Sequence, residues 1–84
     1  MRVKIRLDTT EDVFSFVKTA EMINEEILIK DGNGKCVSGK SILGMLYALE
    51  FDHLWCECEK DIYFKIQKYV IEEWINVLRI YNSN

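Results

Sequence analysis

Two cysteines, Cys56 and Cys58, come closest by type and spacing to a chemical site. They alternate within an extended segment, so both thiols lie on one face, about 7 Å apart. Cys36 or His53 could complete a zinc site, but zinc usually takes four ligands, the spacing is not Cys-x-x-Cys, and His53 falls on the opposite face by parity. We therefore expect small buried core residues, with no metal and no cofactor.

Adjacent carboxylates form the second pattern with chemical potential. Glu11 with Asp12, and Glu72 with Glu73, look like the paired acids of general acid–base catalysis. Both pairs fall within helical patterns at positions that face water, where a run of charges is ordinarily solvated. We assign no catalytic residue and expect the protein not to be an enzyme.

Composition limits the remaining functions. The 84 residues have the length of one small domain, and 49% apolar with 30% charged residues is ordinary globular usage. A net charge of -3 gives no bulk attraction to nucleic acid or to an anionic membrane, so such binding would have to come from a local patch. No segment is apolar enough for a membrane span or a signal peptide, and three cysteines suit a reducing compartment. We expect a cytoplasmic protein with no nucleic-acid or membrane partner.

Hydrophobic periodicity predicts the elements that position these residues. Residues 2–7 alternate as a strand, and residues 10–24 follow helical spacing after capping residues. Residues 26–30 and 35–37 read as a hairpin around the turn 31–34. Ser41 is the expected N-cap of a short helix that carries Ile42, Met45, Leu46 and Leu49.

The second half of the chain adds one strand and one long helix. Residues 54–59 alternate as the fourth strand, and residues 61–81 read as the longest helix. The resulting order is βαββαβα. The expected inward stripe of the long helix is Ile62, Ile66, Tyr69, Val70, Trp74 and Val77.

The segment Gly39-Lys40-Ser41-Ile42-Leu43-Gly44-Met45, which follows Asn33-Gly34-Lys35, adds a family resemblance to this order. It resembles HPr, the histidine-containing phosphocarrier protein of the bacterial sugar phosphotransferase system, whose second helix opens with Lys-Ser-Ile-Met-Gly. The match is ungapped from about residue 27 to 60. It implies one HPr-like domain over residues 1–84 with an α+β, open-faced β-sandwich fold: a four-stranded antiparallel sheet with three helices on one face.

The chain departs from this family where phosphate would be carried. HPr proteins present a histidine and an arginine just before the first helix, whereas here Thr10 lies nearest the histidine position and Asp12 nearest the arginine. His53 is the one histidine and precedes the fourth predicted strand. The acids Glu11 and Asp12 at the N-terminus of this helix also repel a phosphoryl group. We expect no phosphohistidine chemistry.

The family's regulatory serine is retained as Ser41, flanked by Lys40 and Ile42. The resemblance implies phosphorylation of Ser41 by a dedicated kinase, as in histidine-less relatives that bind a transcription regulator. A phosphate there would meet free N–H groups of the helix. The alternative is that Ser41 serves only as a helix cap.

Surface residues supply the remaining candidates. Lys40, Leu43, Tyr47 and Phe51 are partner-binding candidates on the second helix, with a core position left open for the last three. Trp55 faces outward, and if the first and fourth strands are neighbours it meets Arg2, Lys4 and Arg6. Such a face could stack bases or associate with itself, but the acidic total and the neighbouring Glu57 and Glu59 argue against nucleic acid. We expect a cross-strand cation–π and salt-bridge layer.

These patterns lead to one preferred function and two alternatives. We expect a non-catalytic HPr-like regulatory domain whose partner is a regulator, a kinase or a phosphotransferase component, and which is a monomer or a weak homodimer. The first alternative is a phosphocarrier with a non-histidine acceptor. The second is a structural domain that self-associates through its open sheet face.

Overall fold

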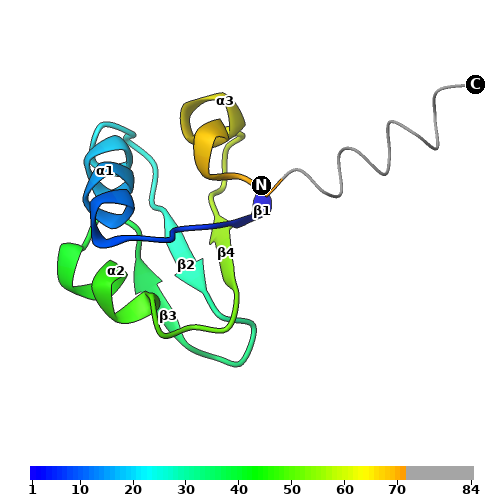
Figure 1. Cartoon of the computed structure of the whole chain (residues 1–84). Coiled ribbons are helices and arrows are strands. Elements are labelled where there is room, and N and C mark those ends of the chain that lie inside the picture. Colours follow the sequence, from blue (N-terminus) through cyan, green and yellow to red (C-terminus); the bar gives the residue numbers. More distant parts are fainter. Residues whose placement is uncertain (72–84) are drawn as a thin grey trace, which may run out of the picture.

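Residues 1–71 are described in the computed structural model of the chain. Four strands form one sheet, and helices occur in the three expected places (Figure 1). The fold is therefore α+β, as predicted. The elements are β1 (Arg2–Ile5), α1 (Thr10–Glu21), β2 (Leu28–Lys30), β3 (Cys36–Ser38), α2 (Ile42–Ala48), β4 (Leu54–Glu57), α3 (Tyr63–Ile66) and a 3-10 turn, η1 (Gln67–Tyr69).

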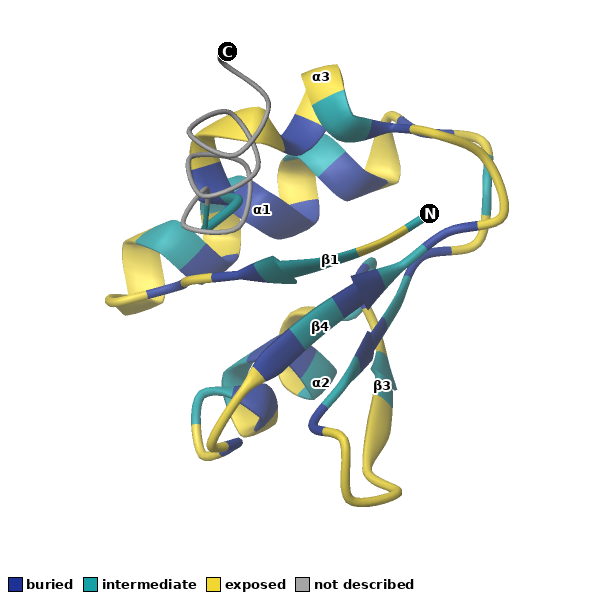
Figure 2. Ribbon diagram, turned by 90° about the vertical axis from the view of Figure 1, so that its right-hand side faces the viewer, coloured by how far each residue is buried: buried dark blue, intermediate teal, exposed yellow. Residues whose placement is uncertain are grey.

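The sheet has the strand order β1-β4-β2-β3, with every neighbouring pair antiparallel. Val3 and Ile5 of β1 pair with Cys56 and Leu54 of β4. Because side chains alternate across a strand, these residues share one face and the polar residues between them share the other. Figure 2 shows this alternation along β4 as buried and half-buried bands.

The core lies between the first of these faces and the helices. Helix α1 contributes Val13, Phe16, Val17 and Ala20 at helical spacing, and all four are buried. Sheet residues such as Ile29 and helix residues such as Met45 and Ile66 are fully buried in the same cluster. Burial of this apolar surface is the main stabilising contribution to a domain of this size.

The predicted helix over residues 61–81 is wrong in its described part. Helix α3 is only four residues long, η1 follows it, and Val70 is extended, with ψ 135°. Val70 forms an antiparallel bridge with Ile5, and hydrogen bonds join Arg6 N–H to the Tyr69 carbonyl and Ile71 N–H to the Lys4 carbonyl, both at 2.9 Å. Pairing with the free edge of β1 satisfies backbone groups that a continued helix would leave exposed. Residues 72–81 lie outside the described residues.

A buried aspartate shapes the hairpin turn between β2 and β3. Asp31 is only 6% exposed, and its Oδ1 accepts hydrogen bonds from the N–H groups of Asn33 (2.6 Å) and Lys35 (3.0 Å). Gly32 and Gly34 have positive φ angles of 86° and 98°, which glycine adopts without strain.

In residues 1–71, no helix has the length and apolar content needed to cross a membrane.

Candidate functional site

Ser41 caps helix α2, as predicted. Its backbone is extended (φ -102°, ψ 118°), and its Oγ accepts a hydrogen bond from Gly44 N–H at 3.0 Å. The Ser41 carbonyl accepts the first helical bond, from Met45 N–H at 2.9 Å. The hydroxyl is half-buried and sits at the rim of the helix.

The two glycines around Ser41 permit close packing. A Cβ on Gly39 would lie 2.7 Å from Ile27 Cγ2, which is too close for any side chain. A Cβ on Gly44 would lie 3.2 Å from both Ser41 Oγ and Val37 Cβ. The glycine spacing of the HPr-like motif therefore has a local cause: the chain passes tightly over the core and then over β3.

Lys40 turns inward, not toward a partner. Its Nζ donates to the Ile23 carbonyl at 2.5 Å, just beyond the end of α1, and its backbone N–H donates to Ser38 Oγ at 3.1 Å. The ammonium therefore satisfies a carbonyl at the C-terminal end of α1 and links α1 to the start of α2. The structure thus gives this partner-binding candidate an internal partner.

The outer side of α2 exposes apolar side chains. Leu43 is 81% exposed, Tyr47 48% and Ile42 45%. Phe51 is a different case, since it is only 8% exposed and its ring meets that of Tyr47 edge to face, with centroids 5.5 Å apart. Of the two positions left open for Phe51, the structure has the core position. Helix α2 ends at Ala48, so the four-residue spacing from Leu43 no longer applies.

The start of α1 is built for capping. Thr9 is the N-cap: its Oγ1 accepts from Asp12 N–H at 3.1 Å, and Asp12 Oδ2 accepts from the N–H groups of Asp8 (2.9 Å) and Thr9 (3.2 Å). This capping box satisfies backbone N–H groups at the start of α1. Thr10, nearest the missing histidine, is the exposed first residue of the helix. Asp12 is therefore a structural acceptor, which the expectation of a solvated acid missed.

The predicted cation–π layer around Trp55 is confirmed. The Arg2 guanidinium carbon lies 4.4 Å from the ring centroid, and Lys4 Nζ lies 6.0 Å from it. Glu57 bridges Lys30 (3.1 Å) and Arg2 (3.3 Å) beside the ring. The hydrogen bond from Lys30, reinforced by the charges of Lys30 and Arg2, lowers the pKa of the Glu57 carboxyl. Arg6 instead pairs with Asp8 at 3.3 Å.

Cys56 and Cys58 are buried core residues, as expected, whereas Cys36 is exposed. Burial, with smaller contributions from the neighbouring Cys58 and Glu57, raises the pKa of the Cys56 thiol to about 12. The thiol is therefore protonated and unreactive at neutral pH. In the described part of the chain, no three His, Cys, Asp or Glu side chains are grouped to hold a metal ion.

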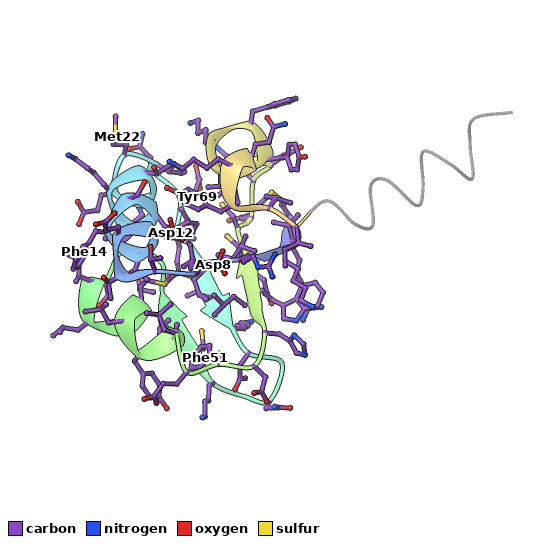
Figure 3. The ribbon with its side chains drawn as sticks, viewed as in Figure 1. Asp8, Asp12, Phe14, Met22, Phe51 and Tyr69 are labelled. Carbon is purple, nitrogen blue, oxygen red and sulfur yellow. The ribbon has the colours of Figure 1, made fainter. Side chains whose placement is uncertain are left out.

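Sequence reasoning missed several features of the helical side. Phe14 (48% exposed) and Met22 (81%) point outward from α1 (Figure 3), although both lie within an apolar-rich segment. Tyr69 lies between α1 and α3, where its hydroxyl hydrogen-bonds to Ser15 Oγ at 2.5 Å and its ring meets Phe16 edge to face at 5.2 Å. No local pattern pairs residues so distant in sequence, so only the packed structure reveals this contact.

Comparison of the chain with protein-family models, with curated proteins and with solved structures finds no match.

Proposed function

We propose that this chain is a divergent HPr-like domain that has lost the phosphocarrier reaction and acts by binding a protein partner through the outer side of α2. One observation carries the proposal: Leu43, Tyr47 and Ile42 expose apolar surface on a helix of seven residues. A cluster of exposed apolar side chains on a small folded domain is typical of a protein-interaction surface.

Element order supports the family assignment. The order βαββαβα and the neighbouring positions of β1 and β4 agree with what the resemblance implies. Gly39 and Lys40 lie in the turn before α2 and Ser41 is its N-cap, which supports the proposal.

The region before α1 argues against the carrier reaction. Thr10 offers only an exposed hydroxyl, and Asp8, Glu11 and Asp12 surround the helix start with negative charge. A phosphoryl group transferred there would need both an activated nucleophile and a positive field.

Ser41 gives this surface a means of regulation. A phosphate on its Oγ would add close to two negative charges one residue from Ile42 and two from Leu43. A partner that made apolar contacts at the start of α2 would then have to desolvate a dianion. Phosphorylation would therefore weaken the binding of an apolar partner and strengthen the binding of a cationic one.

The carrier reaction is tested with the first enzyme of the phosphotransferase system and labelled phosphoenolpyruvate. We expect no label on this chain under conditions that fully label a histidine-containing HPr. Transfer of label would overturn the proposal and support the alternative of a non-histidine acceptor.

Partner binding is tested by calorimetry with the transcription regulator that recognises HPr-like proteins. We expect Leu43→Ser to weaken binding by about 1–3 kcal/mol, since an exposed leucine on a contact surface loses its buried area. Phe64→Ser is the matched control, because Phe64 is 87% exposed on α3 and lies outside the proposed surface. Equal affinities for wild type and Leu43→Ser would contradict the assignment of this surface.

A further inference from the structure

The open face of the sheet carries two polar rows that run across all four strands. The strand register aligns Lys4, Trp55, Lys30 and Cys36 in one row, and Arg2, Glu57, Leu28 and Ser38 in the next. We call Arg2, Lys4, Lys30 and Trp55 the basic face. Its tryptophan lies on the inner strand β4, with a lysine on the strand at either side. Lys35 is not part of the basic face, because its Nζ lies on the α2 side, 5.8 Å from the ring centroids of Tyr47 and Phe51.

A cavity of about 340 Å³ adjoins this tryptophan, in the size range of small-ligand sites. It is lined by Arg2, Lys30, Gly32, Gly34, Lys35 and Cys36, which include three cations and no carboxylate. The glycine turn forms its rim: a Cβ on Gly32 would lie 4.0 Å from Trp55 Nε1, and one on Gly34 would meet no atom within 4 Å. The N–H groups of Asn33 and Lys35 in this turn already donate to Asp31. The cationic side chains of Arg2 and Lys30 are therefore what suits the cavity to an anionic ligand.

The charge of the basic face is locally positive although the chain is acidic. Glu57 is the one carboxylate in the two paired rows, and its charge is balanced by Arg2 and Lys30. Arg2, Lys4 and Lys30 outnumber this one carboxylate, so these two rows keep an excess of positive charge. The hollow beside Met1 adjoins this face, since it shares Arg2, Leu28 and Glu57 with it, and it is lined also by Glu25, Glu26 and Glu59. The positive charge is therefore concentrated in the row of Lys4, Trp55 and Lys30.

We propose that the basic face binds nucleotides, either free or within a single strand, with phosphate in the cavity and the base stacked on the Arg2–Trp55 pair. The Arg2 guanidinium, 4.4 Å from the ring centroid, already makes a stack that a planar base can extend or enter. Lysines on both sides of the ring supply the phosphate contacts. The expectation of no nucleic-acid partner rested on the net charge and on Glu57 and Glu59 beside Trp55. Glu57 is paired with Arg2 and Lys30.

The test is a fluorescence titration in a Trp74→Phe background, which leaves Trp55 as the one indole reporter. An oligouridine of about eight nucleotides and uridine monophosphate serve as probes. We expect oligouridine to quench Trp55, with an affinity that falls as salt rises. Quenching by the mononucleotide at similar affinity identifies a free nucleotide as the ligand, whereas a marked gain with chain length identifies a strand.

Charge-matched variants provide the control. Lys4→Gln with Lys30→Gln removes the lysines on both sides of Trp55. This pair should lower the affinity roughly tenfold and reduce the salt slope by about 1.4, as expected for two lost phosphate contacts. The control pair, Lys18→Gln with Lys65→Gln, changes the net charge by the same amount but lies on α1 and α3. It should leave the affinity and the salt slope unchanged. Equal effects of the two pairs, absence of quenching, or equal affinity for an abasic strand of the same length would each overturn the proposal.

Discussion

At the scale of single residues, the Ser41 hydroxyl is both a helix cap and the modification site that we propose. Its Oγ already accepts the Gly44 N–H at 3.0 Å. Any experiment that removes the hydroxyl to prevent phosphorylation therefore also removes a helix cap.

We expect Ser41→Ala to lower the free energy of unfolding by about 1 kcal/mol, because the Gly44 N–H loses its acceptor. Ser41→Asp keeps an acceptor at the same place and should stay within a few tenths of a kcal/mol of wild type. Urea denaturation followed by circular dichroism measures both. A Ser41→Ala protein as stable as wild type would show that the cap contributes nothing.

The same pair of variants sharpens the kinase test. We expect the serine kinase that modifies HPr proteins to label the wild type and neither variant. The folded Ser41→Asp protein excludes loss of structure as the reason for lost labelling. Label on either variant would place the modified residue elsewhere.

Cys56 predicts a dependence of stability on alkaline pH. The unfolded thiol ionises near pH 9.0, whereas the folded thiol keeps its proton up to about pH 12. The unfolded state therefore binds fewer protons in this window, and stability falls as pH rises, by up to about 1.4 kcal/mol per pH unit from this group.

The measurement is the urea midpoint of wild type and Cys56→Ala at pH values below and above 9. Cys56→Ala is less stable at neutral pH because it leaves a cavity. Its deficit should shrink as pH rises, since it lacks the titrating thiol. A deficit that stays constant with pH would contradict the assigned thiol pKa.

At the scale of elements, the connection from β3 to α2 depends on the absence of side chains. We expect Gly39→Ala to destabilise the protein by about 1–3 kcal/mol, because its Cβ would lie 2.7 Å from Ile27 Cγ2 and 3.3 Å from Phe16 Cε1. Gly44→Ala meets contacts of 3.2 Å and gains helix propensity of about 1 kcal/mol, so its loss should be smaller. Thermal unfolding of the two variants measures the difference, and the reverse order would contradict this packing.

Helix and strand starts were predictable from the sequence, whereas several ends were not. The starts of α1 and α2 carry side-chain caps, Thr9 and Ser41, that are visible as residue types. The ends depend on neighbours distant in sequence. The helical pattern of residues 42–51 continues to Phe51, yet α2 ends at Ala48 and Phe51 N–H bonds to the Ala48 carbonyl as the chain turns into the core.

The candidate site was predictable to a similar extent. Alternation located Trp55 and its cationic neighbours, because register and parity follow from the pattern once β1 and β4 pair. The inward path of Lys40 was not predictable, since a long side chain reaches the Ile23 carbonyl only after α1 and α2 have packed.

At the scale of the whole molecule, the segment after η1 completes an edge of the sheet. The bridge between Ile5 and Val70 and the bond from Ile71 N–H to the Lys4 carbonyl use backbone groups of β1 that would otherwise face water. A helical pattern in the sequence cannot predict this pairing, because the competing partner lies at the opposite end of the described chain.

We expect Ile71→Pro to be less stable than Ile71→Ala by about 1 kcal/mol, because proline removes the N–H that bonds to the Lys4 carbonyl at 2.9 Å. Proline at position 71 should add no strain at the preceding residue, since Val70 already has the extended backbone (φ -75°, ψ 135°) that a residue before proline prefers. Denaturant unfolding of the two variants measures the difference. Equal stabilities would show that edge pairing at Ile71 contributes little.

The contact between Tyr69 and Ser15 also bears on the rate of folding. These residues are 54 positions apart, and the Met1 ammonium bonds to the Cys58 carbonyl across 57 positions. Such contacts form only after long loops have closed, and loop closure costs entropy before any contact compensates for it. We therefore expect slower folding than in a helical bundle of equal length, with Tyr69 docking late and substitutions there accelerating unfolding more than they slow folding.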